Sequence, residues 1–342
     1  MGIILTIVIL AVLLITFLSV TEYKPKDISA AITENKINGM FVGEEDTLKI
    51  LSWNIGYGGL DKDSDFFMDG GKMVNPVDRS HIDNNLKAIS KFVKEQNSDF
   101  TLLQEVDRKS SRTDKINEIE YINNELNQSY SYAQNFLCKF VPYPLPPIGT
   151  VDAGVAVFSN FAPLDSQRYS LPCPFKWPVR TANMKRCLLK NRYKLENGKE
   201  LVIVNLHLEA YDEGEGKIAQ TEKLLKILEE EYEKGNYVIA GGDFNQTFPK
   251  GNEVYTVNNS DDWTPGTLNE DILPEGWQFA YDTEVPSCRL LDKPYTTFDD
   301  MQHYVLDGFI ISPNVELVSI KNEDLKFENS DHNPVILEVN LQ

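Results

Sequence analysis

Cysteine and histidine are scarce in this sequence of 342 residues, which contains four of each. Four cysteines are too few for the disulfide framework of a small secreted scaffold. No two of them form a C-x-x-C pair, which argues against a structural zinc site. Either two disulfides outside a cell or four thiols inside one would fit, so the cysteines do not identify a compartment. They are Cys138, Cys173, Cys187 and Cys288.

Positive charge is also in short supply, with 33 Lys and Arg against 52 Asp and Glu and a net charge of −19. A surface this acidic repels a long polyanion unless a local basic patch or a bound cation intervenes. Long nucleic acids are therefore disfavoured partners. The composition, 42% hydrophobic and 25% charged, is typical of globular proteins and excludes a disordered chain. The length suits one large domain or two ordinary ones.

Long apolar runs are limited to one, at the N-terminus, where residues 3–20 carry no charge. As a helix this run is about 27 Å long, close to the hydrocarbon thickness of a bilayer. It predicts a transmembrane anchor in residues 1–20, with a signal peptide as the alternative. No Lys or Arg precedes the run, and Ser19, Val20 and Thr21 make a poor cleavage site. We therefore favour the anchor.

The charges beside this run say little about topology. Lys24 and Lys26 follow it and nothing basic precedes it, which by the positive-inside rule weakly favours a cytoplasmic domain. Glu22 and Asp27 lie among these lysines and reduce the bias. We expect a monomeric, single-pass membrane protein with its main domain outside the cytoplasm, although the sequence leaves the side open.

Beyond a polar linker over residues 21–46, short apolar runs alternate with helical patterns. The apolar runs predict strands over 48–54, 100–104, 154–158, 201–206, 237–240, 304–311 and 334–339. Helical spacing predicts one helix that opens at Ser80, with Asp83 as its capping-box partner, and a second over 217–234. Because strands and helices are intermixed throughout, residues 47–342 are expected to form one α/β domain.

Polar residues recur where these strands end. Each alone has an ordinary explanation as a turn residue or a structural histidine. Six such placements in one chain instead indicate a site, because strand ends hold side chains in fixed geometry at a cleft. The residues are Asn54, Glu105, His207, Asp243 with Asn245, Asp307, and Asp331 with His332.

These residues stand in motifs that resemble those of the endonuclease/exonuclease/phosphatase superfamily. That superfamily includes deoxyribonucleases of the pancreatic type, abasic-site endonucleases, inositol polyphosphate 5-phosphatases and neutral sphingomyelinases. The motifs occur in the expected order and span about residues 47–342. They are Trp53-Asn54, Gln104-Glu105-Val106-Asp107, Asn205-Leu206-His207-Leu208, Gly242-Asp243-Phe244-Asn245, Leu306-Asp307 and Ser330-Asp331-His332-Asn333-Pro334-Val335.

The resemblance implies a four-layered α/β/β/α sandwich, with two mixed β-sheets flanked by helices, to which the N-terminal transmembrane helix is added. It also implies phosphate ester hydrolysis with a divalent cation, Mg²⁺ first and Mn²⁺ or Ca²⁺ as alternatives. Glu105 would be the principal metal ligand, with Asn54 and Asp331 beside it. Hard oxygen ligands of this kind suit Mg²⁺.

The resemblance further assigns catalytic roles. Asp243 would orient or deprotonate the attacking water, and Asn245 would hold a phosphoryl oxygen. His332 would contact the phosphate, with Asp307 fixing its tautomer and charge. His207 would donate a hydrogen bond or proton near the leaving group. The division of roles among His207, Asp243 and His332 stays open.

The remaining histidines and one arginine are weaker candidates. Arg180 could reach a substrate anion, although a structural or solvated arginine is as plausible. His81 and His303 are expected at the surface. Around Asp307 the sequence reads Tyr-Val-Leu-Asp-Gly, which departs from the Pro-x-Trp-x-Asp-Arg typical of inositol polyphosphate 5-phosphatases and argues against that activity.

The leading hypothesis is a membrane-anchored, metal-dependent phosphodiesterase or phosphatase. The anchor would place the cleft near lipid, and the acidic surface disfavours duplex DNA, so a lipid headgroup or a small phosphorylated molecule is the expected substrate. A nuclease acting on DNA or RNA is the alternative. A binding protein that has kept the fold without catalysis is a third hypothesis, disfavoured because every expected catalytic residue type is present.

Overall fold

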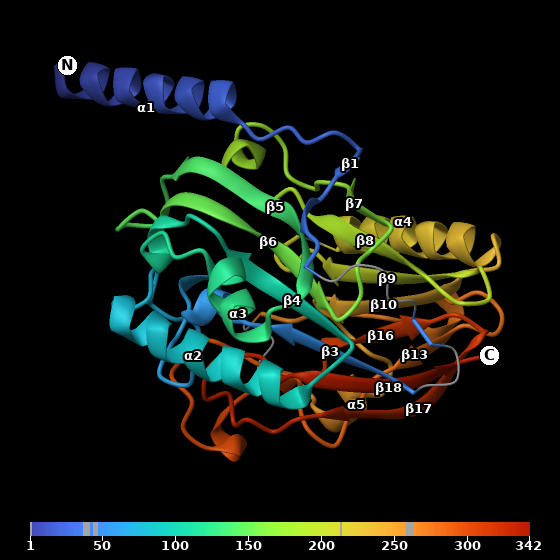
Figure 1. The fold of residues 1–342 in the computed structure, drawn as a ribbon. Helices are drawn as coiled ribbons and strands as arrows, with labels where there is room; N and C mark the ends of the chain where they lie inside the picture. The colour runs from blue at the N-terminus through green and yellow to red at the C-terminus, as the bar shows by residue number, and fades with distance from the viewer. Residues whose placement is uncertain (1, 37–41, 44–46, 213, 258–262) are drawn as a thin grey trace.

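Two seven-stranded sheets form the body of the protein (Figure 1). The computed structural model describes residues 2–36, 42–43, 47–212, 214–257 and 263–342. The first sheet has the strand order β1 (Ile28–Ala30), β7 (Asp165–Ser170), β8 (Cys187–Lys194), β9 (Glu200–His207), β10 (Tyr237–Asp243), β16 (Asp307–Ile311) and β13 (Gln278–Ala280). The second has the order β17 (Val315–Asn322), β18 (Val335–Leu341), β3 (Leu48–Asn54), β4 (Phe100–Asp107), β6 (Gly149–Ser159), β5 (Ser129–Val141) and β2 (Ile32–Glu34).

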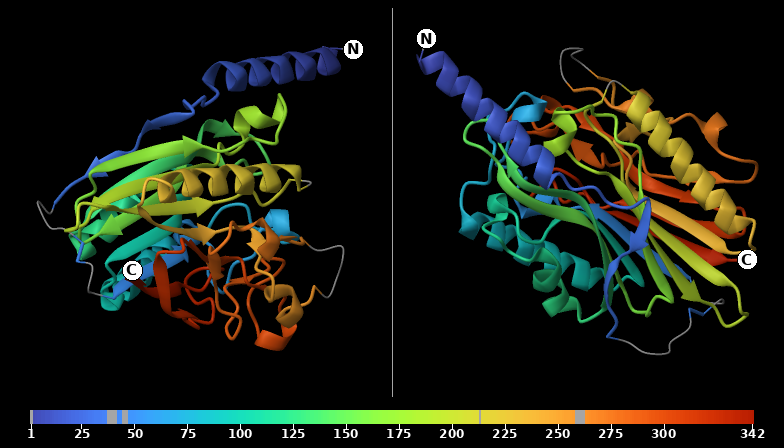
Figure 2. Two further views of the ribbon diagram at one scale, coloured as in Figure 1. Left: turned by 90° about the vertical axis from the view of Figure 1, so that its right-hand side faces the viewer. Right: turned by 90° about the horizontal axis from the view of Figure 1, so that it is seen from above.

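Helices cover the outer faces of both sheets. α2 (Arg79–Gln96) and α3 (Glu118–Leu126) pack on the second sheet, and α4 (Glu215–Tyr232) packs on the first (Figures 1 and 2). The inner faces pack on each other through a core that includes Ile50, Phe100, Ile203, Ile239 and Leu337. Both sheets are mixed, since β3 pairs parallel with β4 and β9 parallel with β10 while their other neighbours are antiparallel. The predicted four-layered sandwich is confirmed.

Central strands are apolar throughout because they are covered on both faces. β10, for example, is buried at every position. The sequence missed β5, β7, β8 and β17, which are richer in polar residues. Two short pairs complete the strands, β11 (Gln246–Thr247) with β12 (Gly266–Thr267) and β14 (Cys288–Arg289) with β15 (His303–Tyr304), and α5 (Gly251–Val254) is a single turn.

The start of α2 differs from its prediction. The cap is Asp78, whose carboxylate accepts a hydrogen bond from the backbone N–H of His81 at 2.9 Å. Ser80 therefore lies inside the helix and does not cap it. The carboxylate of Asp78 meets the unpaired N–H of the third helical residue, which is the geometry a helix N-cap requires.

The N-terminal helix α1 (Gly2–Thr21) stands apart from the body over most of its length (Figures 1 and 2). It is long and apolar enough to cross a membrane, a property that a signal sequence near the N-terminus shares. Part of the predicted linker, residues 37–41 and 44–46, lies outside the described residues. The described part adds β1 to the first sheet beside β7 and β2 to the second beside β5. This segment therefore contributes an edge strand to each sheet as well as linking the helix to the body.

Buried amides join the two sheets directly beneath the polar strand ends. Gln104 of β4 donates to the side-chain oxygen of Asn205 of β9 at 2.8 Å. Asn205 donates in turn to the carbonyl oxygens of Leu103 and Ala156. Asn205 has a partner for its oxygen and for its nitrogen, and a buried amide bonded in this way favours one arrangement of the surrounding strands. These contacts hold the ends of β4 and β9 at a set distance from each other.

A buried ion pair on the far side of the first sheet offers a test of the fold. Glu231 lies 2.7 Å from the ammonium of Lys190, and both side chains are buried. We expect Glu231→Gln to lower the free energy of unfolding by about 3–5 kcal/mol at pH 7, because the lysine would be left buried without its charge partner. Urea denaturation in detergent would measure the loss, with the exposed neighbour Glu230→Gln as the control.

The same pair predicts a pH dependence. Burial alone would raise the pKa of Glu231, but the hydrogen bond and charge of Lys190, with Lys234 and Arg192, lower it from 4.5 to about 2. A lowered carboxyl pKa stabilises the fold above the unfolded value and loses that effect as the carboxylate is protonated. The difference between wild type and Glu231→Gln should therefore shrink as pH falls from about 4.5 towards 2. A difference that is constant over this range would contradict the assignment.

Candidate active site

The polar side chains predicted from the sequence meet between the ends of the two sheets. The amide of Asn54, at the end of β3, donates to the carboxylate of Asp243, at the end of β10 in the other sheet, at 3.0 Å. Glu105 follows in β4, His207 ends β9, and Asp307 begins β16. One cleft of about 820 Å³ is lined by Glu105, His207, Asp243, Asn245, Asp331 and His332, while Asn54 and Asp307 are buried behind them.

Asp243 is at the centre of this group. The Nε2 atoms of His207 and His332 lie 3.4 Å and 3.7 Å from its Oδ2 atom. Its Oδ1 atom accepts the backbone N–H of Asn245 at 2.8 Å. Burial raises the pKa of Asp243 to about 6, against the lowering effect of the His332 charge. A carboxylate with this pKa can take up a proton near neutral pH, as a general base must.

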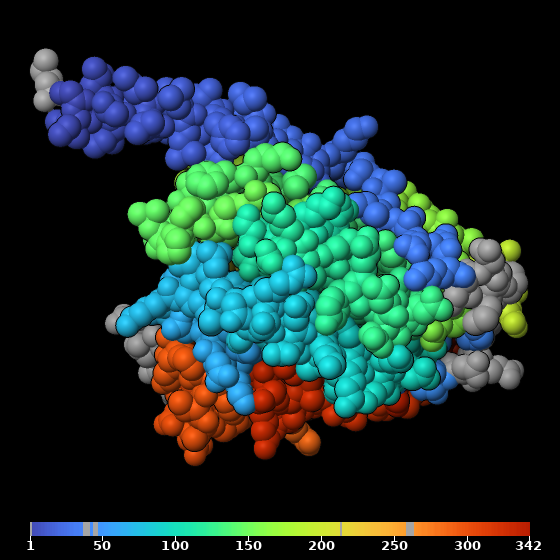
Figure 3. All heavy atoms as spheres, turned by 60° about the vertical axis from the view of Figure 1, so that its left-hand side comes forward, coloured from blue at the N-terminus to red at the C-terminus, as the bar shows by residue number. Residues whose placement is uncertain are grey.

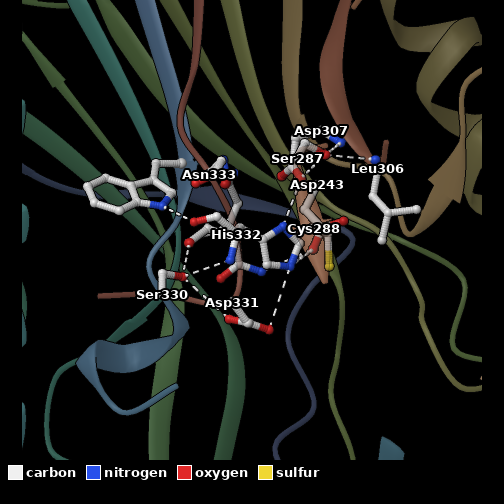
Figure 4. Close-up of polar contacts among 12 residues, drawn as sticks. Asp243, Ser287, Cys288, Leu306, Asp307, Ser330, Asp331, His332 and Asn333 are labelled. Atoms are coloured by element: carbon white, nitrogen blue, oxygen red, sulfur yellow. Dashed lines mark hydrogen bonds and ion pairs between the residues drawn. The ribbon is translucent and has the colours of Figure 1, made fainter. Parts of the chain in front are cut away.

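His332 is held by a chain of buried hydrogen bonds (Figure 4). Its Nδ1 atom lies 2.8 Å from Asp307, which also accepts the hydroxyl of Ser287 at 2.7 Å. Its backbone carbonyl accepts the indole N–H of Trp53. Burial is the largest single effect and would lower the pKa of His332, but the surrounding negative charges, Asp307 first among them, together outweigh it and raise the pKa well above its ordinary value. This raised pKa favours the imidazolium form of His332.

His207 has the opposite charge state. Burial lowers its pKa well below the ordinary value, and the positive charges of Arg186 and His332 lower it further. Its Nε2 atom lies 4.0 Å from Glu105 as well as 3.4 Å from Asp243. The site therefore holds one neutral and one charged histidine on either side of the same carboxylate. Environments that separate two pKa values in this way assign different roles to the two groups.

Glu105 reaches the cleft through an irregularity in its strand. The pairing of β4 with β6 shifts register between Leu103 and Val106, and Glu105 has a φ of 54°. A non-glycine residue in the left-handed region stores strain, and bulges beside active sites redirect side chains. Asn54 supports Glu105 by donating to it at 3.3 Å.

The carboxylates of Glu105 and Asp331, predicted from the sequence to bind a divalent cation, both line the cleft. Burial and, to a smaller extent, the nearby charge of Glu105 raise the pKa of Asp331 to about 7, against the lowering effect of His332. A bound cation would relieve this repulsion between two oxygen donors. The Asn54 oxygen accepts the backbone N–H of Gly56 at 3.0 Å, so in this arrangement Asn54 positions Glu105 and Asp243. Its predicted role as a ligand stays untested.

A second set of donor atoms suits a cation less well. Atoms of Asp243, Asp307 and His332 also lie within 4.8 Å of one another. The Nδ1 atom of His332 is already engaged by the carboxylate of Asp307 at 2.8 Å, so two members of this set are paired with each other. Glu105 and Asp331 stay the predicted ligands of the cation.

The structure does not bring Arg180 into the cleft. Its guanidinium pairs with Glu22, just after α1, at 3.2 Å. The arginine that lines the cleft is Arg186, which is 3% exposed. Among the described residues, its Nε and Nη1 atoms have no hydrogen-bond partner, and Glu209 is 3.6 Å away. Arg186 directly precedes β8, so the signal of polar residues at strand ends would have found it if β8 had been predicted.

The two other histidines differ from each other. His81 is partly exposed, and its Nε2 atom lies 3.0 Å from Asp61. His303 was expected at the surface, but it is buried, with its ring stacked between Phe298 and Phe327 at 4.4 Å and 5.7 Å. Burial lowers its pKa to about 4. The aromatic rings come from segments that no local pattern in the sequence joins.

The layered sandwich, with polar side chains gathered at the ends of its strands, defines the class of protein. Comparison with known families then identifies the family. Residues 51–332 match the model of the Endonuclease/Exonuclease/phosphatase family, and the chain belongs to this family. Members of the family are phosphoesterases and nucleases, generally dependent on a divalent metal. No curated protein matches the sequence significantly.

Solved structures share the fold at low sequence identity. An endonuclease/exonuclease/phosphatase from Beutenbergia cavernae has a TM-score of 0.59 and 16% identity over 86% of this chain and 72% of that one. One from Bacteroides vulgatus has a TM-score of 0.54 and 19% identity over 87% and 100%. TDP2 from D. rerio, complexed with a single-strand DNA product, has a TM-score of 0.55 and 16% identity over 86% and 100%. These similarities concern the fold alone.

Proposed function

We propose that this protein is a membrane-anchored, metal-dependent phosphoesterase that hydrolyses a phosphate ester in the headgroup of a membrane lipid. The observation that carries the proposal is the cleft. Its base holds the carboxylate and histidine groups, whereas its outer wall includes the apolar side chains of Leu14, Ile15 and Leu18 from α1. A polar site at the end of an apolar passage matches a phosphorylated headgroup on a hydrocarbon tail.

Each residue of the site has a separate role in the hydrolysis. Asp243 takes the proton of the attacking water, since its pKa of about 6 leaves it ionised and basic at neutral pH. The oxygen of that water forms a bond to phosphorus as the ester oxygen leaves. The imidazolium of His332 binds a phosphoryl oxygen. The neutral His207 stabilises the leaving oxygen by a hydrogen bond.

Two further groups meet the phosphate. Asn245 uses one amide hydrogen on the carbonyl oxygen of Leu208 at 2.9 Å and has a second for a phosphoryl oxygen. Arg186 contributes a guanidinium whose fork geometry matches phosphate. A divalent cation held by Glu105 and Asp331 would add Lewis-acid stabilisation of the phosphoryl charge, and Mg²⁺ is the best match to two carboxylates that leave room for water.

The test is hydrolysis by the full chain in detergent micelles or reconstituted vesicles. The substrates are sphingomyelin, phosphatidylcholine and phosphatidylinositol, with supercoiled plasmid as the nucleic-acid alternative. We expect Mg²⁺-dependent release of water-soluble headgroup from at least one lipid, with activity lost in EDTA and recovered when Mg²⁺ is restored. Plasmid nicking without lipid hydrolysis would instead establish the nuclease, which a structural neighbour that binds a DNA product makes the second candidate.

The two arginines can be separated by matched substitutions. We expect Arg186→Lys to raise KM by about 10-fold, because a lysine keeps the charge but loses the bidentate fork. Arg180→Lys should leave both KM and kcat unchanged, since Arg180 pairs with Glu22 outside the cleft. Steady-state kinetics on the best lipid substrate would measure both. An effect confined to the Arg180 variant would overturn this placement of the substrate anion.

A further inference from the structure

The last turns of α1 pack against the domain, which sets the height of the domain relative to a bilayer. Leu14 and Leu18 join a cluster with Val141 and Val151, whereas Ile3 to Leu13 project away from the body (Figure 1). A helix of 20 residues is about 30 Å long, which only just spans the hydrocarbon of a bilayer. If α1 spans a bilayer, the turn around Leu14 to Leu18 therefore stays within it. The surface packed against it must lie at the membrane boundary.

Exposed apolar side chains lie on that surface. The tip of the β5–β6 hairpin, residues 142–147, carries Tyr143 and Leu145, and residues 175–180 carry Trp177 and Val179. These four side chains are 57–86% exposed. We call them the docking rim. Figure 3 shows the hairpin, in green, beneath the blue α1 helix.

Trp177 fixes the level of the rim most closely. Its indole N–H donates to the hydroxyl of Ser19, near the end of α1, at 3.0 Å. If α1 spans a bilayer, Ser19 lies near the headgroups, and Trp177 lies there with it. Tryptophan is enriched at this level because its ring is apolar and its N–H is polar.

The charge around the rim is opposite to that of the protein as a whole. The chain has a net charge of −19, yet residues 133–186 contain six basic residues against two acids. Lys24, Lys26, Lys139, Lys176 and Arg180 are exposed, and two of them, Lys24 and Arg180, pair with Glu22. Basic residues close to a membrane surface are attracted to anionic headgroups. A phospholipid surface therefore complements the rim in both polarity and charge.

The rim surrounds the mouth of the cleft. Tyr143 and Val179 line the cleft together with Leu18, and Glu105 and His332 line its base. A lipid in the leaflet next to the rim would face a cleft lined both by apolar side chains of α1 and by the catalytic carboxylates. No transfer of the whole lipid through water is needed.

From this geometry we infer that the docking rim seats the cleft mouth on the phospholipid bilayer, so that the substrate enters from the leaflet itself. The position of the rim depends on α1 and on exposed side chains alone. The identity of the entering molecule as a lipid rests on the proposed function. The two parts can fail separately, and two experiments distinguish them.

Fluorescence quenching tests the position of the rim. Trp177 is 57% exposed, whereas Trp53 and Trp277 are buried. The full chain and its Trp177→Phe variant would be reconstituted in phosphatidylcholine vesicles, with and without phosphatidylserine and with plain or brominated acyl chains. We expect brominated lipid to quench the wild-type emission and to quench the variant much less. Equal quenching of the two proteins would overturn the inference.

Hydrolysis by a rim variant tests the entry route. Leu145→Ser with Trp177→Ser is expected to reduce hydrolysis of vesicle lipid by about 10-fold or more, because two apolar anchors leave the bilayer. Hydrolysis of a soluble phosphodiester, bis(p-nitrophenyl) phosphate, should be unchanged. The control is Ile218→Ser with Val318→Ser, which changes two exposed apolar residues elsewhere. An equal loss on both substrates, or no loss on vesicles, would overturn the entry route.

The combined results identify which proposal fails. Quenching of Trp177 in a wild-type protein that hydrolyses no lipid would retain the docking surface and overturn the lipid-hydrolase function. Lipid hydrolysis without quenching of Trp177 would retain the lipid-hydrolase function and overturn the docking surface.

Discussion

Replacing Asp243 by Asn is expected to lower kcat by about 10²–10⁴-fold, the contribution of a positioned general base. Asparagine has nearly the same shape but cannot take the proton of the attacking water. Asp243 is also the only one of these groups that contacts Asn54, His207 and His332 together. Initial rates on the lipid substrate identified in the panel would measure the loss, with KM changing much less than kcat.

Stability separates a catalytic loss from an unfolded variant. The raised pKa of Asp243 shows that the folded state disfavours its charged form, so its ionisation makes the fold less stable at neutral pH. Asp243→Asn should therefore be at least as stable as wild type in thermal unfolding. Asp165→Asn, an exposed carboxylate at the start of β7, is the matched control and should keep full activity. A kcat within 10-fold of wild type for Asp243→Asn would exclude it as the base.

The second large effect is expected at Asp307. Asp307→Asn should lower kcat by about 10²–10⁴-fold, by analogy with the carboxylate that orients the histidine of a catalytic triad. Asp307 acts through His332 and is a positioning residue. Its carboxylate lies 2.8 Å from the Nδ1 atom and is the main reason that His332 stays protonated. An uncharged amide removes that stabilisation, so the imidazolium should lose its proton at lower pH.

Nuclear magnetic resonance can follow the titration of the His332 ring. A purely structural role of Asp307 would not change that titration. The titration midpoint of His332 should shift to lower pH in Asp307→Asn. Ser287→Ala removes one hydrogen bond to Asp307 but leaves its charge, so it should produce a smaller shift and a smaller loss of kcat. An unchanged titration in Asp307→Asn, with activity lost, would show that the residue acts on the fold instead.

Much of the site could be predicted because its members follow a local pattern. Asn54, Glu105, His207 and Asp243 each come at or near the end of an apolar strand, and short motifs surround them. The strands themselves are recognisable because burial on both faces makes them apolar over their whole length. The family resemblance rested on the same motifs.

Other members could not be predicted because their environment is made by distant segments. Arg180 and Arg186 look equivalent in the sequence, and only the position of Glu22 takes Arg180 away from the cleft. His303 looks like a surface residue until Phe298 and Phe327 cover both sides of its ring. Strands such as β7 and β8 were missed because their polar residues do not follow the simple apolar pattern.

The sequence by itself therefore determined the apolar N-terminal helix, the central strands of an α/β domain and the order of the catalytic residue types, because each depends on runs of neighbouring residues. The layered sandwich followed from the family resemblance that these motifs carry. Only the tertiary structure decided the charge states of the two histidines, since burial and the charges of Asp307 and Arg186 set their pKa values. Only the tertiary structure, too, joined α1 to the mouth of the cleft. That contact brings together Ser19 and Trp177, which are 158 residues apart in the chain, and it depends on how the β5–β6 hairpin packs against the helix.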